Sequence, residues 1–340
     1  MSVTKKICLV GCGRIAHSHV VGIKESADWE IAAAVDQSPE SLESFGEKYG
    51  IERRYTALQA ALDAGGFDAV DICLPNHYHE ENAIAALNAG YHVFVEKPMA
   101  NTSQACQRML DAAAKSGKKL MVNQSRRFYD AVLKSGDMVK KGEIGELISV
   151  TAALMGYLDG PPTEWWRSSS KAGGLMIPLW GNHIFDYILW LFGECPNRVY
   201  CEAFSINPAW EGEDETVIIL GFNNDRYATV KMSWNTRLKP NENWDGAGKM
   251  LSSSDIIYER YIQGTAGTLK LEDETRLLKD GVELISGEQN PGNFTLALRE
   301  FASAIQEGRE PLISGQHAMN LVRVQEAALK SAETHSVVYL

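Results

Sequence analysis

The stretch that decides the fold is KKICLVGCGRIAHSH, residues 5–19. Its first part is a continuous apolar run, which is typical of a strand buried on both faces. Gly11 and Gly13 follow at once, and Ala16 occupies the third small position of the pattern G-x-G-x-x-G/A. Such a strand, turn and helix let the backbone approach a pyrophosphate at the N-terminus of the helix. The stretch therefore predicts a dinucleotide-binding βαβ unit.

The sequence beyond this stretch falls into two patterns. Up to about residue 123, short apolar runs alternate with helix-like segments, which predicts βαβ units and a parallel sheet. Longer strand-like segments then follow one another, with hairpin turns expected at residues 223–226 and 278–284. The predicted fold is α/β, with an N-terminal Rossmann doubly wound parallel sheet and a C-terminal α+β domain that contains a large, mostly antiparallel sheet.

The change of pattern also sets the expected domains. A chain of 340 residues is long enough for two domains of ordinary size. Residues 1–123 form the expected NAD-binding Rossmann domain. Residues 124–340 form the expected domain for substrate binding and oligomerisation.

Charge and cysteine content narrow the function. The formal net charge is −11 at pH 7, which argues against nucleic acid or an anionic membrane surface as a main partner. The apolar run at residues 7–10 is too short for a signal peptide or a membrane span. The six cysteines contain no C-x-x-C pair, so we expect reduced thiols, a cytoplasmic location and no metal site.

An acidic residue at the end of the second predicted strand favours NAD as the cofactor. The carboxylate of Asp36 can accept hydrogen bonds from the hydroxyl groups of a ribose. Gln37 follows instead of an arginine, so this position offers no cation for a 2′-phosphate, although Arg14 can still reach one. We therefore predict NAD rather than NADP. The expected cofactor contacts are Gly11, Gly13, Arg14, Ile15, Asp36, Leu74, Pro75, Asn76, His79, Glu96 and Lys97.

Lys97 stands where a parallel sheet binds its ligands. Such sheets bind at the C-terminal ends of their strands, and YHVFVEKPMA, residues 91–100, has Lys97 at the end of its predicted strand. Pro98 restricts the preceding lysine to extended geometry and is compatible with a cis bond. We expect a lysine fixed at this edge to take part in the chemistry.

Five motifs make the chain resemble a known family. They are GCGRIAHSH, LPNHYH, VEKPMA, NQSRRF and GGLMIPLWGNHIFD, and they span residues 11–186. The sequence is similar to the glucose-fructose oxidoreductase, inositol dehydrogenase and MocA (Gfo/Idh/MocA) family, whose members are mostly NAD(P)-dependent dehydrogenases or reductases of sugars and cyclitols. The resemblance implies that Lys97 and His183 are catalytic, and that the subunits form a homodimer or homotetramer.

The resemblance is incomplete near His183. The family commonly has an aspartate four residues before the histidine, and Leu179 stands there in this chain. The spacing from the preceding glycine pair to His183 is also one residue longer than the resemblance implies. Asp186 shares a helix face with His183, and we expect its role to be structural. The implied mechanism has His183 taking the hydroxyl proton while Lys97 stabilises the same oxygen or shares its proton.

The remaining candidate residues concern the substrate. Aromatic rings stack on the apolar faces of sugars, and polar neighbours bind their hydroxyl groups. The expected substrate contacts are Lys97, Arg127, Tyr157, Trp165, Trp166, Arg167, Trp180, Asn182 and His183. Residues 239–255 form a long polar segment, which we expect to be either a mobile lid or a subunit contact.

Three functions fit this sequence. The first is an NAD-dependent oxidoreductase that transfers a hydride between nicotinamide and a hydroxyl-bearing carbon of a sugar, sugar derivative or cyclitol. The second is a redox-neutral, NAD-dependent cleavage of glycosides through transient oxidation. This function stays possible because Leu179 replaces the aspartate that the family commonly has. The third is a non-enzymatic, cofactor-binding sugar sensor. The presence of both Lys97 and His183 argues against the third, and the fold alone does not decide.

Overall fold

The chain forms two compact units in the computed structural model, which describes residues 4–158, 160–161, 163–238, 256–287 and 289–340. The first unit contains residues 1–128 and 290–319, and the second contains residues 129–289 and 320–340. The units differ from the expected division at residue 123 mainly because residues 290–319 return to the first unit. The segment expected to be a lid or a subunit contact, 239–255, lies outside the described residues.

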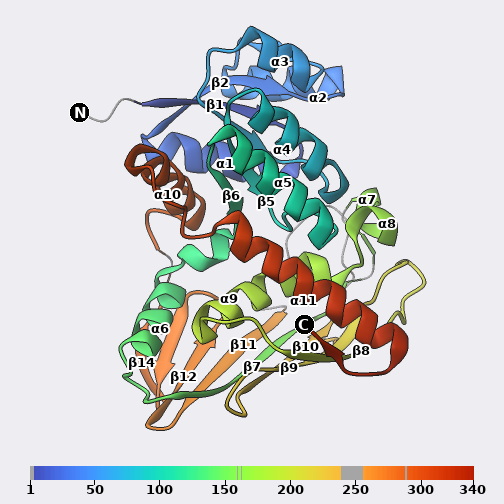
Figure 1. Ribbon diagram of the computed structural model, residues 1–340, viewed down its shortest axis with the longest axis vertical. Coiled ribbons are helices and arrows are strands. Elements are labelled where there is room, and N and C mark those ends of the chain that lie inside the picture. Colours follow the sequence, from blue (N-terminus) through green and yellow to red (C-terminus); the bar gives the residue numbers. More distant parts are fainter. Residues whose placement is uncertain (1–3, 159, 162, 239–255, 288) are drawn as a thin grey trace. The chain divides into compact units, whose positions relative to one another are not determined.

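The first unit is built on a parallel sheet of six strands (Figure 1). The strand order is β3-β2-β1-β4-β5-β6, and each neighbouring pair is parallel. The strands are β1 (Lys5–Val10), β2 (Trp29–Val35), β3 (Arg54–Tyr55), β4 (Ala69–Ile72), β5 (His92–Glu96) and β6 (Leu120–Asn123). The winding direction reverses between β1 and β4, where doubly wound sheets bind ligands. The predicted Rossmann sheet is confirmed.

Helices and short turns connect these strands. They are α1 (Arg14–Ser26), α2 (Pro39–Tyr49), α3 (Leu58–Ala64), η1 (Asn76–Tyr78), α4 (His79–Asn88), α5 (Ser103–Ser116) and η2 (Ser125–Phe128). Local chemistry sets the ends of α2. Its N-cap Ser38 accepts a hydrogen bond from the backbone N–H of Ser41 at 3.3 Å, and Pro39 follows in the first turn. Gly50 ends the helix in the left-handed conformation, with a φ of 72°.

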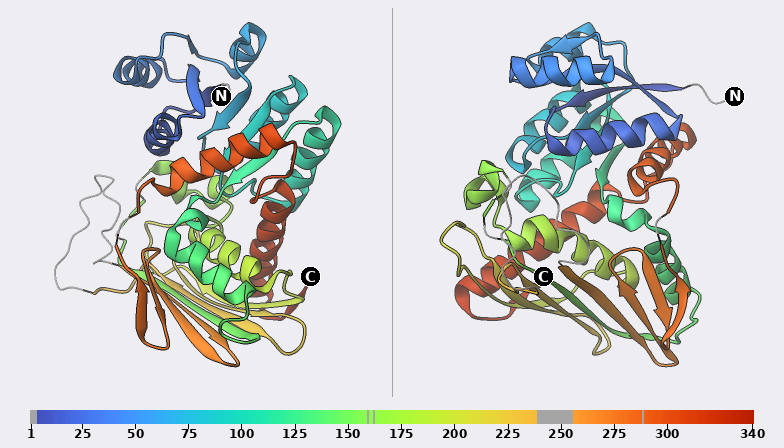
Figure 2. Two further views of the ribbon diagram at one scale, coloured as in Figure 1. Left: turned by 90° about the vertical axis from the view of Figure 1, so that its left-hand side faces the viewer. Right: turned by 180° about the vertical axis from the view of Figure 1, so that it is seen from behind.

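A helix from late in the chain completes the first unit. This helix, α10 (Asn293–Glu307), packs against α1 (Figure 2). The contact is close, since a Cβ added at Gly22 would lie 2.9 Å from the Cβ of Phe294. The indole N–H of Trp29 donates to the carbonyl oxygen of Leu298 at 2.9 Å, and its ring stacks on that of Phe301. These contacts explain why α10 belongs to the first unit.

The second unit contains a sheet of nine strands in the order β14-β13-β12-β11-β7-β10-β9-β8-β15. Among the described strand pairs of this sheet, β7 and β10 are parallel and the others are antiparallel. The strands are β7 (Leu147–Gly156), β8 (Arg198–Phe204), β9 (Glu215–Gly221), β10 (Tyr227–Ser233), β11 (Ile256–Gly264), β12 (Gly267–Glu272), β13 (Arg276–Lys279), β14 (Val282–Ile285) and β15 (Val338–Tyr339). The predicted large, mostly antiparallel sheet is thus confirmed.

Both predicted hairpin turns are present in this sheet. Asn224 and Asp225 join β9 to β10 with φ values of 55° and 57°. Asp280 and Gly281 join β13 to β14 with φ values of 50° and 82°. Two successive residues with positive φ give the tight turn that matches the twist of the strands, and Asn, Asp and Gly adopt this conformation most readily.

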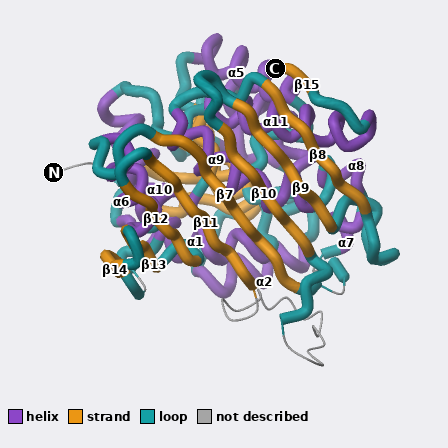
Figure 3. Tube along the Cα trace, turned by 90° about the horizontal axis from the view of Figure 1, so that it is seen from below, coloured by secondary structure: helices purple, strands orange, loops and turns teal. Residues whose placement is uncertain are grey.

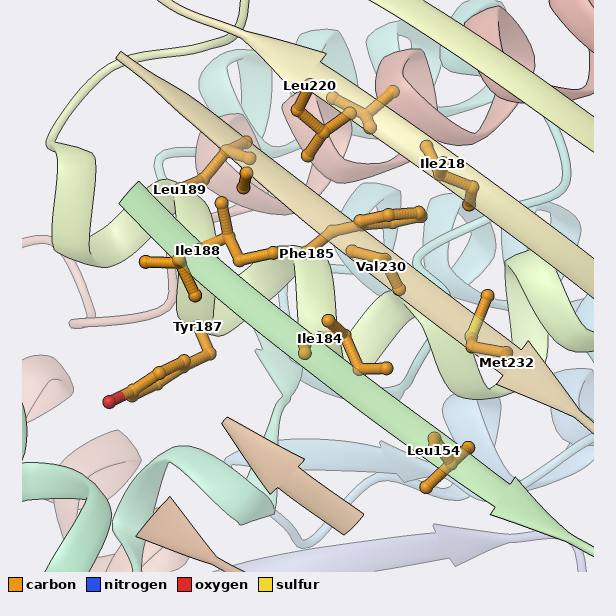
Figure 4. Packing of buried hydrophobic residues seen from close by; sticks show 14 of the residues in the cluster. Leu154, Ile184, Phe185, Tyr187, Ile188, Leu189, Ile218, Leu220, Val230 and Met232 are labelled. Atoms are coloured by element: carbon orange, nitrogen blue, oxygen red, sulfur yellow. The ribbon is translucent and has the colours of Figure 1, made fainter. Parts of the chain in front are cut away.

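Helices pack on one face of this sheet. The helical elements of the second unit are α6 (Asp130–Lys140), α7 (Glu164–Arg167), α8 (Ser169–Ala172), the π-helix η3 (Ile177–Gly181), α9 (Asn182–Phe192) and most of α11 (Gly315–Thr334). Figure 4 shows α9 pointing Ile184, Phe185 and Ile188 toward the buried side chains of β7, β9 and β10. Burial of this apolar stripe holds α9 against the sheet. None of the helices in the described ranges is long and apolar enough to cross a membrane.

The other face of the sheet is open in Figure 3, where the strands lie in front of the helices. Along β9, Ile218 and Leu220 are buried while Val217 and Ile219 are exposed, as the alternation of side chains in a strand requires. Tyr227 and Tyr261 are exposed on β10 and β11, the two strands that flank β7. The second unit therefore has a buried helix-covered face and an exposed face with several large apolar side chains.

Candidate active site

The glycine turn after β1 has the shape that a dinucleotide needs. Gly11 has a φ of +96°, and a Cβ there would lie 2.7 Å from the carbonyl oxygen of Cys73, so the turn requires glycine. Gly13 is the exposed N-cap of α1, and a Cβ there would meet no atom within 4 Å. The first N–H groups of α1 therefore remain open to an anion. Arg14 is exposed and Ile15 is partly exposed in the first turn.

Asp36 is the first residue after β2, and it is tied to the glycine turn. One carboxylate oxygen accepts a hydrogen bond from the backbone N–H of Cys12 at 2.8 Å, and the other accepts one from Ser38 at 2.8 Å. These bonds fix the carboxylate at the strand end, and each oxygen keeps a lone pair for a ribose hydroxyl. Gln37 is exposed and brings no positive charge. The glycine turn and Asp36 therefore fit NAD.

A buried histidine joins the ends of β4 and β5. One ring nitrogen of His79 lies 2.8 Å from the carbonyl oxygen of Leu74, and the other lies 2.8 Å from that of Pro98. Burial lowers the pKa of His79, while its contacts with the two carbonyl groups oppose this effect. Asn76 is also buried, whereas Leu74 and Pro75 are partly exposed at the strand end. His79 thus fixes two strand ends to each other.

Lys97 directly follows β5, and its peptide bond to Pro98 is cis. The side chain is mostly buried. Burial lowers the pKa of the ammonium group to about 8; the Glu96 carboxylate opposes the shift, and the charges of Arg126 and Arg14 add to it. A larger fraction of this amine is therefore unprotonated near neutral pH than of an ordinary lysine.

The carboxylate of Glu96 is buried and bound on both oxygens. One oxygen lies 2.8 Å from Nε2 of His19 and accepts a hydrogen bond from the amide of Asn123 at 2.6 Å. The other accepts a hydrogen bond from the backbone N–H of Lys97 at 3.1 Å. His19 and Asn123 stand within the motifs GCGRIAHSH and NQSRRF, but they were not among the expected site residues. The available signal was Asp71, an acidic residue inside an apolar strand, because a buried charge needs a partner.

Arg127, an expected substrate contact, lies in the first unit. It belongs to η2 and is 6% exposed. Its Nη2 lies 2.8 Å from Nε2 of His317 in α11. Since a guanidinium only donates hydrogen bonds, this imidazole nitrogen is the acceptor. The two residues are 190 positions apart in the sequence, which is why no local motif indicates the contact.

His183 follows an unusual helical turn in the second unit. α9 begins at Asn182, and the π-helix η3 directly precedes it. A π turn holds about one residue more than an α turn. It therefore accommodates the extra residue between the glycine pair and His183. Leu179 lies within this turn, is 2% exposed and belongs to the apolar core.

Aromatic rings pack beside His183. The Trp180 and His183 rings have centroids 6.5 Å apart and planes at 68°. Trp180 also meets Trp234 edge to face, with centroids 5.3 Å apart. His183 is partly exposed, whereas Asn182 and Asp186 are 1% and 3% exposed. The partial exposure of the imidazole leaves it accessible to a ligand, and the burial of Asp186 agrees with a structural role.

A buried carboxylate holds the segment that leads to His183. Glu213 accepts hydrogen bonds from the backbone N–H groups of Leu175 at 3.1 Å and Ile177 at 2.8 Å. Burial raises the pKa of Glu213, and these hydrogen bonds act in the opposite direction. A negative charge at the start of a helical turn is stabilised by the unpaired N–H groups there. Glu213 was not among the residues indicated by the sequence.

The other expected substrate contacts lie on short elements of the second unit. Trp165, Trp166 and Arg167 belong to α7, where the two indole rings meet edge to face with centroids 6.0 Å apart. Both tryptophans are partly exposed, and Arg167 is exposed. Tyr157 follows β7, and the guanidinium carbon of Arg237 lies 3.6 Å from the centre of its ring. Partly exposed aromatic rings of this kind can stack on a sugar.

Comparison with known protein families identifies both parts of the chain. Residues 5–124 match the oxidoreductase family with an NAD-binding Rossmann fold, and residues 132–269 match the GFO/IDH/MocA C-terminal domain. The two matches describe one family and together cover more than half of the chain. The chain belongs to the GFO/IDH/MocA family. It is thus an oxidoreductase with an NAD-binding domain, as the resemblance predicted.

Several known proteins resemble this GFO/IDH/MocA family member along nearly its whole length. D-apiose dehydrogenase of Paraburkholderia graminis is 25% identical, with 98% of this chain and 89% of the relative covered. Myo-inositol 2-dehydrogenase of Thermotoga maritima is 25% identical, with 98% of each covered. A crystal structure of aldose-aldose oxidoreductase from Caulobacter crescentus is 25% identical with a TM-score of 0.85, and the match covers 99% of this chain and 100% of that one.

Proposed function

We propose that this protein transfers a hydride between NAD and a hydroxyl-bearing carbon of a sugar, a sugar derivative or a cyclitol. Lys97 carries the proposal, because it stands at the end of β5 and burial lowers its pKa to about 8. A lysine that exchanges its proton near neutral pH suits the interconversion of a hydroxyl and a carbonyl group. Relatives named D-apiose dehydrogenase and myo-inositol 2-dehydrogenase support a substrate with many hydroxyl groups.

The proposed chemistry divides between the cofactor and two side chains. NAD, when bound, accepts the hydride that leaves the carbon. We assign to His183 the removal of the hydroxyl proton, so that a carbonyl group forms as the hydride departs. We assign to Lys97 a hydrogen bond to the same oxygen, which stabilises the negative charge that develops there. In the reverse direction His183 returns the proton to the oxygen.

The second unit supplies most of the proposed substrate contacts. Tyr157, Trp165, Trp166 and Trp180 offer partly exposed rings for the apolar face of a sugar. Arg167 and Asn182 are the proposed partners of its hydroxyl groups, together with Arg127 of the first unit. Partly exposed rings beside a partly exposed imidazole support this assignment.

One observation favours a redox-neutral alternative. Leu179 is buried where the family pattern commonly has an aspartate, so this position supplies no carboxylate to His183. In that alternative the hydride is taken from a glycoside and returned within one turnover, and the glycosidic bond breaks between the two transfers. No NADH then accumulates, which separates the two functions experimentally.

A spectrophotometric screen tests the proposal. The purified protein is incubated with NAD, and separately with NADP, against a panel of sugars, cyclitols and glycosides while absorbance reports NADH or NADPH. We expect NADH to accumulate with at least one free sugar or cyclitol. Consumption of a glycoside without net NADH, measured by chromatography of the same samples, would instead support the redox-neutral alternative. Binding of sugars without turnover in either assay would support a sensor.

We also propose a homodimer or homotetramer in a reducing compartment. The exposed face of the nine-stranded sheet carries Val217, Ile219, Tyr227 and Tyr261, and such apolar side chains favour association. The six cysteines form no disulfide in the described part of the chain, which agrees with a cytoplasmic location. Light scattering at micromolar concentration should show an assembly larger than one chain. A monomer at that concentration would contradict the proposed assembly.

A further inference from the structure

A chain of buried polar side chains runs beneath Lys97 in the first unit. Nδ1 of His19 lies 2.9 and 3.0 Å from the two carboxylate oxygens of Asp71. Nε2 of His19 lies 2.8 Å from a carboxylate oxygen of Glu96, which also binds the amide of Asn123. His19 comes from α1, whereas Asp71, Glu96 and Asn123 come from the adjacent strands β4, β5 and β6. His19 and Asp71 are each 0% exposed, and Glu96 is 7% exposed.

This geometry sets the charge of His19. Both ring nitrogens face carboxylate oxygens, which only accept hydrogen bonds when ionised, so both nitrogens must carry protons. Burial alone would lower the pKa of His19, but the charge of Asp71 and its hydrogen bond outweigh burial and hold the pKa well above its usual value. The imidazole is therefore a cation between two carboxylates.

The same geometry argues against a metal ion here. His19, Asp71 and Cys73 lie close enough together to be considered as metal ligands. A protonated imidazole has no lone pair to give, and burial raises the pKa of the Cys73 thiol, which keeps it protonated. The three groups form a hydrogen-bonded ionic chain instead, with Sγ of Cys73 3.7 Å from Asp71.

Two aromatic rings pack against the His19 ring. Its ring centroid lies 5.8 Å from that of Phe94 in β5 and 5.2 Å from that of Phe294 in α10. The charged groups are thus shielded from water, and electrostatic interactions are stronger in such an environment. An ion pair placed here acts on its neighbours more strongly than one at the surface.

Glu96 connects this buried chain to Lys97. The Glu96 oxygen that does not contact His19 accepts a hydrogen bond from the backbone N–H of Lys97 at 3.1 Å. Burial would raise the pKa of Glu96, but the hydrogen bond and charge of His19, with Lys97 and Asn123, hold the pKa below its usual value. The ionised Glu96 in turn opposes the fall in the pKa of Lys97 that burial causes, while Arg126 and Arg14 favour that fall.

We propose that the Asp71–His19–Glu96 chain fixes the charge and position of the Glu96 carboxylate beside Lys97, which makes His19 a positioning residue for the lysine. The catalytic meaning of this inference rests on the proposed function, but its electrostatic content does not. Without the cation, two carboxylates would be buried around one site, and one of them would take up a proton. Loss of the charge on Glu96 would then leave burial and the two arginines to act on Lys97.

Competitive labelling of Lys97 tests this inference in the full chain without cofactor. The reactivity of its amine toward acetic anhydride is followed from pH 6 to 10 by peptide mass spectrometry, which gives its pKa. We expect a value of about 8 in the wild type. His19→Gln and Glu96→Gln should each lower it, and a decrease of one unit from this value raises the amine fraction at pH 7 from roughly a tenth to roughly a half. The double variant should show no further decrease, because both changes remove the same carboxylate charge.

His17→Gln is the matched control on the same helix. The Nδ1 of His17 lies 2.6 Å from the hydroxyl of Tyr49 in α2, away from the ionic chain, so this variant should leave the pKa of Lys97 unchanged. An unchanged Lys97 in folded His19→Gln protein would overturn the inference. Should His19→Gln not fold, ¹⁵N NMR of histidine-labelled wild type decides: we expect a doubly protonated His19 ring at pH 7.5, and a neutral ring would overturn the inference. Neither readout requires a sugar to be oxidised, so failure here is distinct from failure of the proposed function.

Discussion

The segments that carry Lys97 and His183 are held in different ways. Lys97 stands at a strand end above a buried ionic chain, in which side chains bind side chains across α1 and three strands. His183 stands at the start of α9, after a π turn. The Glu213 carboxylate accepts hydrogen bonds from the backbone N–H groups of Ile177, the first residue of this turn, and of Leu175 just before it. We propose that the first arrangement controls the charge of Lys97. The second sets the path of the backbone that carries His183.

This difference indicates how each segment should respond to substitution. A change in an ionic chain alters pKa values through space, because buried charges interact strongly. A change at a backbone cap alters stability and position, because it leaves N–H groups without an acceptor. Variants can therefore separate an electrostatic effect on the lysine segment from a geometric effect on the histidine segment.

The largest expected effect comes from Lys97→Ala. Turnover of a verified substrate should fall by a factor on the order of a hundred to ten thousand, the range for a lost acid–base group. Folding and NAD binding should be nearly unchanged, since a strand-end side chain adds little to the core. Lys97→Arg should not restore turnover, because arginine keeps its proton and has a different shape. Near-normal turnover in Lys97→Ala would show that Lys97 is not a catalytic residue.

His183→Ala should lower turnover by a factor of the same order, about a hundred or more. The double variant with Lys97→Ala should lose less than the product of the two single losses, because both groups are proposed to act on one proton transfer. Steady-state kinetics of the three variants measures this coupling. Fully multiplicative losses would show that the two residues act in separate steps.

Glu213→Gln tests whether the Glu213 carboxylate holds the backbone that leads to His183. An amide oxygen in place of Oε1 can still accept both N–H groups, but the NH₂ group then replaces the oxygen that also accepts from Leu175, and the negative charge is lost. The loss should be about 1–3 kcal/mol of the free energy of unfolding. Chemical denaturation measures the loss. Turnover should fall while the affinity for NAD stays the same. Glu143→Gln is the matched control, because Glu143 is exposed and a surface substitution away from helix caps costs at most about 0.5 kcal/mol. Equal losses in the two variants would contradict the capping role.

Asp36→Ala should give the smallest effect. Wild type should bind NAD more tightly than NADP, because the carboxylate accepts ribose hydroxyls and repels a 2′-phosphate. The variant should narrow the ratio of the two dissociation constants by roughly tenfold, the change expected for a hydrogen bond to a charged group. Fluorescence titration measures both constants. Tighter binding of NADP by the wild type would contradict the prediction.

The fold was largely predictable because its signals are local. The run at residues 5–19 and the strand–helix alternation after it define the parallel sheet, and both hairpin turns follow from Asn, Asp and Gly at the required positions. The place of α10 was not predictable in this way. Its contacts with Gly22 and Trp29 join residues more than 250 positions apart, and an amphipathic helix does not reveal which surface it covers.

The candidate site shows the same limit. Lys97 and Asp36 stand at strand ends that the pattern locates, and the family resemblance points to His183. The residues that contact these segments, His19 and Glu213, were not indicated. His19 stands within the motif GCGRIAHSH, but the motif does not show that its side chain is buried beside Glu96, and Glu213 lies outside every motif. The extra residue before His183 was visible in the sequence, but its accommodation as a π turn was not, because this depends on backbone hydrogen bonds.

The return of residues 290–319 to the first unit has a consequence for how the protein is made. The ribosome releases residues 129–289 before α10 exists, so the N-terminal unit is completed only after most of the second unit has been made, although its synthesis begins first. Until then, the Trp29 indole lacks its acceptor, Leu298, and the Phe294 ring is absent from the His19 site. A message truncated before codon 290 would therefore yield a chain whose dinucleotide-binding unit lacks α10. The surface of α1 and Trp29 that α10 covers would stay exposed, and chaperones and proteases recognise such incompletely folded units.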